Sequence, residues 1–228
     1  MAVSVYDEKS LGCESILLID DHPIVRLGLT QLINQQPDLM VCGEVESGQE
    51  ALEAIAAYQP TLILVGLALQ GADGLSMLKL ICDHAPRTPL LVLSDYDETL
   101  YAVRALQAGA RGYFPKRSKT EALIGAIRQV LRGDIAVSER LTSRLVQTAI
   151  TGRSALEDTP VARLSNRELE VLRYVGQGLS TREIASTLCL SIKTVETHRS
   201  HIMKKLHLGH ARDLIRYAVH WSSHLEQN

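Results

Sequence analysis

The stretch ILLIDDHPIVRLGL, residues 16–29, decides the fold of this 228-residue chain. It begins with the apolar run Ile16–Ile19 and continues with two carboxylates, Asp20 and Asp21. It then takes up the 3.6-residue period of an amphipathic helix, which we expect over Ile24–Asn34. A short buried strand that runs into a helix is the building unit of parallel sheets. Function in such sheets gathers at the carboxyl ends of the strands, so the two aspartates mark a candidate site.

The same alternation continues to about residue 132 and gives five strand–helix units. The further strands are expected at Met40–Val45, Thr61–Val65, Leu90–Leu93 and Gly112–Phe114. The further helices are expected at Gly48–Tyr58, Leu75–His84, Thr99–Ala108 and Lys119–Leu131. Ser118 and Glu121 form a predicted capping box at the start of the last helix. This pattern predicts an α/β fold with a five-stranded, doubly wound parallel sheet covered by helices on both faces.

Polar residues also follow the fourth and fifth predicted strands. Ser94 comes directly after the fourth strand, and Lys116 comes after the fifth, shortly behind Tyr113. Because parallel strands end at one edge of the sheet, these side chains should meet Asp20 and Asp21 there. Carboxylates are the usual start of a hard-cation site, since Mg²⁺ prefers oxygen ligands. Taken singly, the acidic pair could be a polar helix entry and Lys116 a surface lysine, but their joint placement favours a shared site.

The motifs ILLIDDHPIVRLGL, VLSD and GYFPK resemble a response-regulator receiver of the NarL/FixJ type, which has a flavodoxin-like fold. The resemblance covers about residues 15–133. In that family the third strand ends in an aspartate that accepts a phosphoryl group from a histidine kinase. The resemblance implies that Asp20 and Asp21 match the metal-holding pair and that Ser94 matches the switch hydroxyl. It further implies that Tyr113 matches the switch aromatic residue and Lys116 the lysine that pairs with the acyl phosphate.

The resemblance breaks at the end of the third strand, in TLILVGLALQGADG, residues 61–74. The phosphoacceptor position is Gly66, which can neither form an acyl phosphate nor supply a third metal ligand. We therefore expect an atypical receiver that lacks the phosphoacceptor aspartate and has no catalytic residue and no cofactor. Mg²⁺ binding at Asp20 and Asp21 should be weak at most, because one carboxylate is missing. We also expect Lys116 to pair directly with Asp20 or Asp21.

The loop after Gly66 leaves two alternatives open. Ala68 and Gln70 also depart from the family pattern, which favours a natural loss of the acceptor over an engineered change, although one sequence does not decide this. Asp73 is a candidate surrogate acceptor. Its ordinary role would be in the turn and at the helix cap, where aspartate is favoured.

Composition changes along the chain and indicates its organisation. Residues around 133–150 predict one more helix, with Leu141, Leu145 and Ala149 at four-residue intervals, and the polar segment Thr151–Pro160 predicts a linker. The N-terminus is acidic and has no apolar core, so it does not resemble a signal peptide. The expected domains are a flexible tail, a receiver-like domain, a linker helix with a flexible linker, and a helical domain, at residues 1–14, 15–133, 134–162 and 163–228.

The last domain differs from the rest in charge and in its predicted elements. Residues 1–162 carry 14 Lys and Arg against 20 Asp and Glu, whereas residues 163–228 carry 10 against 6. A basic C-terminal third suggests a polyanionic partner. Capping boxes are predicted at the starts of the first two helices, from Ser165 with Glu168 and from Ser180 with Glu183. Ser191 is the predicted cap of the third helix. A fourth helix is expected over Ala211–Trp221.

The stretch GLSTREIASTLCLSIKTVETHRSHIMKKL, residues 178–206, predicts a helix-turn-helix motif running from Thr181 to Ser200. Cys189 and Leu190 form its turn, and the second helix extends to about Leu206. One face of this helix is apolar and should be buried, with Val195, Ile202 and Leu206. The predicted DNA-binding residues are Lys193, Thr194, Glu196, Thr197, His198, Arg199, Ser200, His201, Lys204 and Lys205. Lysine and arginine provide counterion release, and the shorter polar side chains can reach base edges. A generic amphipathic helix with a solvated polar face is the alternative.

The segments LSNRELEVL, GLSTREIASTL and SIKTVETHRSHIMKKL resemble the LuxR-type DNA-binding domain over residues 164–221. The resemblance implies a four-helix fold whose recognition helix enters the major groove of double-stranded DNA. It also implies a homodimer formed through the last helix.

Together these features predict a sequence-specific DNA-binding transcription regulator of the response-regulator type, controlled without aspartyl phosphorylation. One alternative is an interaction protein that docks through its receiver and binds DNA only secondarily. Another is a phosphorelay member that uses Asp73, and a partner protein or a histidine kinase stays open. No nucleophile–histidine set, P-loop or complete metal cage occurs in the sequence, so we do not expect an enzyme.

Hydropathy and cysteine usage bound the location of the protein. The longest apolar run, Leu62–Leu69, is far shorter than the ~20 residues of a membrane-spanning helix, so we expect a cytoplasmic protein with no membrane partner. The four scattered cysteines are expected to be small core residues in a reducing compartment, and they are Cys13, Cys42, Cys82 and Cys189.

Overall fold

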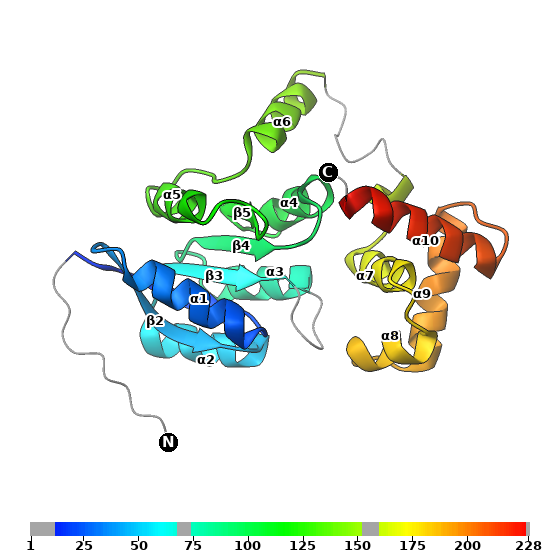
Figure 1. Ribbon diagram of the computed structural model, residues 1–228, viewed down its shortest axis with the longest axis horizontal. Helices are drawn as coiled ribbons and strands as arrows, with labels where there is room; N and C mark the ends of the chain where they lie inside the picture. The colour runs from blue at the N-terminus through cyan, green and yellow to red at the C-terminus, as the bar shows by residue number, and fades with distance from the viewer. Residues whose placement is uncertain (1–11, 68–73, 152–159, 227–228) are drawn as a thin grey trace. The chain divides into compact units, whose positions relative to one another are not determined.

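The computed structural model describes residues 12–67, 74–151 and 160–226 of the chain (Figure 1). These residues divide into two compact units, one that extends to Ser138 and one that begins at Glu139. No helix of the described residues is long and apolar enough to cross a membrane.

The first unit is a parallel sheet of five strands, as predicted. The strands are β1 (Glu14–Ile19), β2 (Leu39–Val45), β3 (Leu62–Gly66), β4 (Leu90–Ser94) and β5 (Gly112–Pro115). They lie in the order β2-β1-β3-β4-β5, and every neighbouring pair is parallel. The order reverses between β1 and β3, so a crevice is expected at their carboxyl ends.

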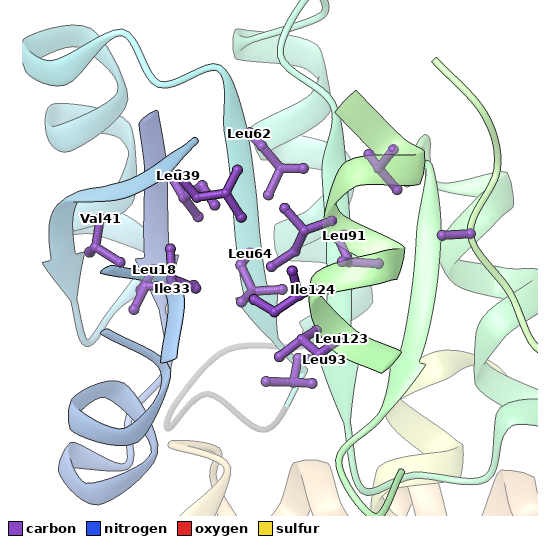
Figure 2. Close-up of a cluster of buried hydrophobic side chains, with 14 residues drawn as sticks. Leu18, Ile33, Leu39, Val41, Leu62, Leu64, Leu91, Leu93, Leu123 and Ile124 are labelled. Atoms are coloured by element: carbon purple, nitrogen blue, oxygen red, sulfur yellow. The ribbon is translucent and has the colours of Figure 1, made fainter. Parts of the chain in front are cut away.

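Five helices connect and cover the strands. They are α1 (Pro23–Asn34), α2 (Gly48–Tyr58), α3 (Gly74–His84), α4 (Glu98–Gln107) and α5 (Thr120–Leu131). Helices α1 and α5 pack on one face of the sheet, where Ile33 of α1 and Leu123 of α5 join Leu64 and Leu91 in one buried cluster (Figure 2). Helix α3 lies between α2 and α4, and Figure 1 shows α2 and α3 behind the sheet. Burial on both faces explains why the strands are almost continuously apolar.

The second unit consists of helices. After α6 (Glu139–Thr151) and a short 3-10 helix (Pro160–Arg163) come α7 (Asn166–Gly176), α8 (Thr181–Thr187), α9 (Ile192–Lys205) and α10 (Ala211–Glu226). Helix α7 packs against α9 and α10, and α8 packs against α9. The core residues come from all four of the later helices and include Leu169, Leu172, Ile184, Val195, Ile202, Leu214 and Ala218.

The predicted helix starts in this unit are confirmed. The Ser165 hydroxyl accepts from the Glu168 amide while the Glu168 carboxylate accepts from the Ser165 amide, and Ser180 and Glu183 repeat this reciprocal cap. Ser191 caps α9 by accepting a hydrogen bond from the Thr194 amide. Each cap satisfies backbone donors that a helix start leaves without an internal partner.

Three predictions about elements were wrong. The Ser118–Glu121 capping box does not form, because α5 begins at Thr120 and Lys119 is its N-cap, while the Ser118 amide donates to the Pro115 carbonyl in a turn. The helix expected from residue 133 begins only at Glu139, because Ala136 pairs with Gly112 at the sheet edge. Helix α10 continues past Trp221 to Glu226.

The cysteines behave only partly as expected. All four are free thiols, and Cys13, Cys42 and Cys82 are half-buried. Cys189 is exposed rather than a core residue. Its place in the turn of the helix-turn-helix explains this, since the turn takes a left-handed backbone there (φ +52°) and points away from the helical core. The segments 1–11 and 152–159, which include most of the expected tail and linker, lie outside the described residues.

Candidate functional site

The strand ends bring the predicted polar residues of the first unit together. Asp20 follows β1 and is only 3% exposed, and Ser94 at the end of β4 is equally buried. Gly66 ends β3 beside them, and Lys116 follows β5. The Lys116 amide donates to the Ser94 carbonyl over 2.9 Å, which fixes the lysine backbone against β4. The shared edge predicted from the sequence is therefore present.

Lys116 pairs directly with Asp20, as predicted. Its Nζ lies 2.8 Å from Asp20 Oδ2, and both side chains are largely buried. Asp20 Oδ1 accepts a hydrogen bond from the His22 amide over 2.9 Å, so both carboxylate oxygens are engaged. A buried carboxylate is tolerated only when such partners replace its water.

The glycine at the end of β3 allows this arrangement. A Cβ atom at Gly66 would lie 2.6 Å from Asp20 Oδ2 and 3.2 Å from Asp20 Cγ. Asp20 thus occupies the space into which a side chain at position 66 would project. A side chain there would have to push Asp20 aside and disturb its ion pair with Lys116.

Asp20 and Asp21 form a small cluster with the imidazole of His22, a residue that was not singled out from the sequence. His22 Nδ1 lies 2.7 Å from Asp21 Oδ1 and 3.2 Å from Asp20 Oδ1. One ligand atom each from Asp20, Asp21 and His22 lie close enough to share a cation. This set fits Mg²⁺ poorly, because position 66 supplies no oxygen and the Lys116 ammonium already holds Asp20.

The two predicted switch residues, Ser94 and Tyr113, are joined through the backbone of Tyr96. Tyr113 is 1% exposed, and its phenol donates to the Tyr96 carbonyl over 2.8 Å. The Tyr96 amide in turn donates to the Ser94 hydroxyl over 3.1 Å. Burial raises the pKa of the Tyr113 phenol well above its ordinary value, so the group stays a neutral donor. The aromatic ring is therefore held inside, next to Ser94.

A buried arginine, Arg26, fixes the backbone next to the acidic pair, and it was not singled out from the sequence. Arg26 of α1 donates from Nη1 to the Asp20 carbonyl over 2.6 Å. It also pairs with Glu46 and lies 3.7 Å from Glu44. The guanidinium thus ties α1 to the loop after β2 and fixes the backbone at Asp20. Its signal in the sequence is a single basic residue among the apolar positions of a predicted helix.

The second unit presents α9 as its most polar and basic helix. Its buried side is as predicted, with Val195, Ile202 and Leu206 in the core. Six of the predicted DNA-binding residues are exposed, namely Lys193, Glu196, Thr197, Ser200, His201 and Lys204. Four are half-buried, namely Thr194, His198, Arg199 and Lys205. The helix therefore has the two faces that a recognition helix needs.

The half-buried members of this set have partners inside the unit. Arg199 Nη1 donates to the Thr181 hydroxyl over 3.0 Å, which links α9 to α8. The Lys205 Nζ lies 2.6 Å from Glu168 Oε2 and links α9 to α7. Both residues position α9 within the unit, and the fully exposed residues are the better-placed candidates for DNA contacts.

Glu168 is the charged centre of the helical unit. It is 3% exposed, caps α7, pairs with Lys205, and has His201 Nδ1 at 3.8 Å. Burial disfavours its ionised form, but hydrogen bonds from Lys205 and from the Ser165 backbone outweigh this and lower its pKa. Burial also lowers the pKa of His198, against the opposing charge of Glu168. Glu168 is therefore ionised near neutral pH and Lys205 stays bound to it.

Known proteins match both units. Residues 16–128 match the response regulator receiver domain, and residues 162–218 match the bacterial regulatory proteins of the luxR family. The oxygen regulatory protein NreC of Staphylococcus carnosus is 37% identical over 208 residues, which cover 90% of this chain and 96% of NreC.

Two solved structures are similar over most of the chain. RcsB from Salmonella enterica serovar Typhimurium, bound to promoter rprA in the presence of the phosphomimetic BeF3⁻, superimposes with a TM-score of 0.64 and 25% identity, covering 91% of this chain and 98% of RcsB. A structure of two RcsB dimers bound to two parallel DNAs gives a TM-score of 0.62 and 25% identity, covering 90% and 98%.

Proposed function

The chain belongs to the response regulators that join a receiver domain to a DNA-binding domain of the luxR family, and from this premise we propose how it works. It is a sequence-specific transcription regulator that binds double-stranded DNA as a homodimer. Its receiver is atypical and acts without aspartyl phosphorylation. It has no catalytic role of its own.

The exposed face of α9 is the observation that carries the DNA-binding part of the proposal. Lys193 and Lys204 supply positive charge for phosphates, while Thr197, Ser200 and His201 lie between them and suit base edges. The similar structure of RcsB bound to promoter rprA is consistent with this assignment.

Selection from random DNA with the full-length protein tests this assignment. A regulator of this kind should enrich a two-fold related motif with half-sites about one helical turn apart. Enrichment of no motif by an intact dimer would instead favour the interaction-protein alternative. That alternative draws on exposed apolar residues of α1, Ile24 at 80% and Leu27 at 58%, which suit a protein partner.

Gly66 and the Lys116–Asp20 pair are the observations that support control without phosphorylation. The chain has no carboxylate at the end of β3, and the lysine that would pair with an acyl phosphate is already bound to Asp20. Tyr113 is held inside without a phosphoryl group. We infer that DNA binding is set by dimerisation, by a partner protein or by a ligand instead.

Incubation of the full-length protein with acetyl phosphate and Mg²⁺, followed by intact mass spectrometry, tests this part. We expect no covalent phosphoryl adduct. An adduct mapped to Asp73, which lies outside the described residues, would establish the surrogate-acceptor alternative and restore a place for a histidine kinase.

The last helix supports the homodimer. Ile215 and Val219 of α10 lie four residues apart, so they share one face, and they are 45% and 48% exposed. An exposed apolar strip on this helix suits a copy of itself across a two-fold axis. The RcsB dimers bound to DNA offer a precedent among the similar structures.

A further inference from the structure

A cavity of about 620 Å³ opens at the amino-terminal edge of β4 and β5, the sheet edge opposite Gly66, Asp20 and Lys116. It lies where α3, α4 and α5 end and the chain turns toward the next element. Its lining residues are Cys82, Ala85–Pro89, Leu106, Gly109–Arg111, Val130, Leu131, Gly133 and Ile135. None of them belongs to the site described above. The volume lies within the range of small-molecule sites, roughly 300–1,000 Å³.

The cavity forms where the backbone turns at the ends of α3, α4 and α5. The Thr88 amide donates to the Ala85 carbonyl after α3, the Ala110 amide to the Ala105 carbonyl after α4, and the Gly133 amide to the Val130 carbonyl after α5. These turns satisfy carbonyls that a helix end otherwise leaves free, so they present less negative charge to the cavity. Gly109 has φ +111° and a Cβ there would lie 2.9 Å from Cys82 Sγ, so this wall cannot be filled by a side chain.

The cavity presents polar and apolar surface in similar amounts. Most of the lining residues are aliphatic or proline, including Leu106, Val130 and Ile135. Two exposed arginines, Arg87 and Arg111, stand on the rim. Among the described residues, no Asp or Glu lines the cavity, and neither arginine has a carboxylate within salt-bridge distance. A hollow that offers aliphatic side chains together with two guanidinium groups is complementary to an apolar body that carries an anionic head.

We propose that this cavity binds a small amphipathic anion, an aliphatic or aromatic body with one carboxylate or phosphate group. The body packs against the aliphatic wall, and Arg87 and Arg111 hold the head at the rim. The site is independent of the DNA-binding assignment, because every residue that forms it lies in the first unit.

The bound anion would touch the segment that leaves the sheet toward α6. Ile135 lines the cavity, and the next residue, Ala136, donates to the Arg111 carbonyl over 3.0 Å and accepts from the Tyr113 amide over 2.8 Å. Ser138 then binds Glu98 of α4 through its hydroxyl over 2.7 Å. A ligand that contacts both Arg111 and Ile135 should therefore stabilise the pairing of residues 133–138 with β5.

Titration of the isotope-labelled full-length protein with sodium octanoate, followed by amide chemical shifts, tests the site. An anion with about ten non-hydrogen atoms should saturate it with Kd on the order of 1 mM. The shifts should cluster at residues 85–89, 109–111 and 133–136, and hydrogen exchange of 133–138 should slow. Octyl phosphate in place of octanoate distinguishes the two head groups, and the tighter probe identifies the one preferred.

Matched variants separate recognition of the anion from general attraction. The double variant Arg87→Gln with Arg111→Gln should weaken octanoate binding about tenfold or more, while Arg132→Gln, an exposed arginine that does not line the cavity, should change it less than about twofold. 1-Octanol, with the same body and no charge, should bind more weakly than octanoate. Shifts that do not saturate, equal loss in Arg132→Gln, or equal binding of octanol would each overturn the proposal.

Discussion

Single side chains at the sheet edge determine what this receiver can do. A buried ammonium and a buried carboxylate stabilise each other only as a pair, and removal of one leaves the other without compensation. Lys116 and Asp20 form such a pair, and Gly66 leaves the room for it. We propose that these three residues take the place of acyl-phosphate chemistry at this edge of the sheet.

Lys116→Met should reduce the free energy of unfolding of the full chain by about 3 kcal/mol, because Asp20 stays buried without its ammonium partner. Urea denaturation measures the loss. Asp20→Asn combined with Lys116→Met should recover most of it, since no charge is then left unpaired. The same substitution at Lys79, which is exposed, serves as the control and should change stability by less than about 0.5 kcal/mol.

Gly66→Asp should lower the thermal midpoint when no divalent cation is present, because its Cβ would stand 2.6 Å from Asp20 Oδ2 and a third carboxylate adds repulsion. MgCl2 should raise the midpoint of this variant and leave that of the wild type nearly unchanged. Gly66→Ala adds the Cβ without the carboxylate, so its midpoint should fall and not respond to Mg²⁺. An equal response to Mg²⁺ in the wild type would show that the two aspartates already hold the ion.

At the scale of strands and helices, the sequence was sufficient to predict the elements of the sheet unit. Each strand and each helix of the sheet unit begins and ends within about two residues of its expected place, because continuous apolar runs and 3.6-residue periods are signals of the local sequence. The Lys116–Asp20 pair was also predictable, since parallel strands must end together and Gly66 left the lysine without another acidic partner.

Other features depend on contacts between distant segments, and local patterns did not reveal them. Because α5 begins at Thr120, Ser118 lies in the turn before the helix and does not cap it. Because Ala136 pairs with Gly112, α6 begins later in the chain than expected. Arg26 reads as one polar residue in an amphipathic helix, and only the fold brings Glu46 and the Asp20 carbonyl to it. The cavity at the amino-terminal ends of β4 and β5 likewise forms only where the ends of α3, α4 and α5 come together.

On α9, Lys193 is exposed, whereas Lys205 is half-buried and paired with Glu168, so we expect the two lysines to have different roles. Lys193→Ala should weaken binding to the selected DNA and lower the slope of log affinity against log salt concentration by about 0.9, the effect of one lost phosphate contact. Lys205→Ala should leave the slope nearly unchanged and instead destabilise the unit, because Lys205 holds Glu168. Fluorescence anisotropy at several salt concentrations distinguishes the two outcomes, and equal slopes for both variants would contradict them.

Acid should loosen the contact between α7 and α9. The folded-state pKa of Glu168 lies below its ordinary value of 4.5, so its ionised form stabilises the fold above that pH, and this contribution is lost as the pH falls through the folded pKa. Glu168→Gln should cost about 1.5–3 kcal/mol at neutral pH and flatten the decline below about pH 4.5. Fluorescence of Trp221, the single tryptophan, reports the unfolding of this unit. Glu196→Gln, at an exposed position of α9, should keep the decline.

At the scale of the whole molecule, a receiver domain with a glycine at the end of β3 is joined to a luxR-family unit that exposes one polar face of α9. In the proposed homodimer, two-fold symmetry should set both the affinity for DNA and the spacing of the half-sites, since each half-site needs one recognition helix. Ile215→Glu with Val219→Glu should weaken dimerisation by at least about tenfold and reduce DNA affinity with it. Sedimentation velocity gives the oligomeric state. His220→Glu, exposed on a different side of the same helix, should leave the dimer intact.

The central claim is that this regulator binds its DNA site without a phosphoryl group on the receiver. Its most direct test is to measure the affinity of the full-length protein for the selected site before and after incubation with acetyl phosphate and Mg²⁺, with the intact mass recorded on the same samples. We predict an unchanged mass and an unchanged affinity. A mass increase of one phosphoryl group together with tighter DNA binding would contradict the claim.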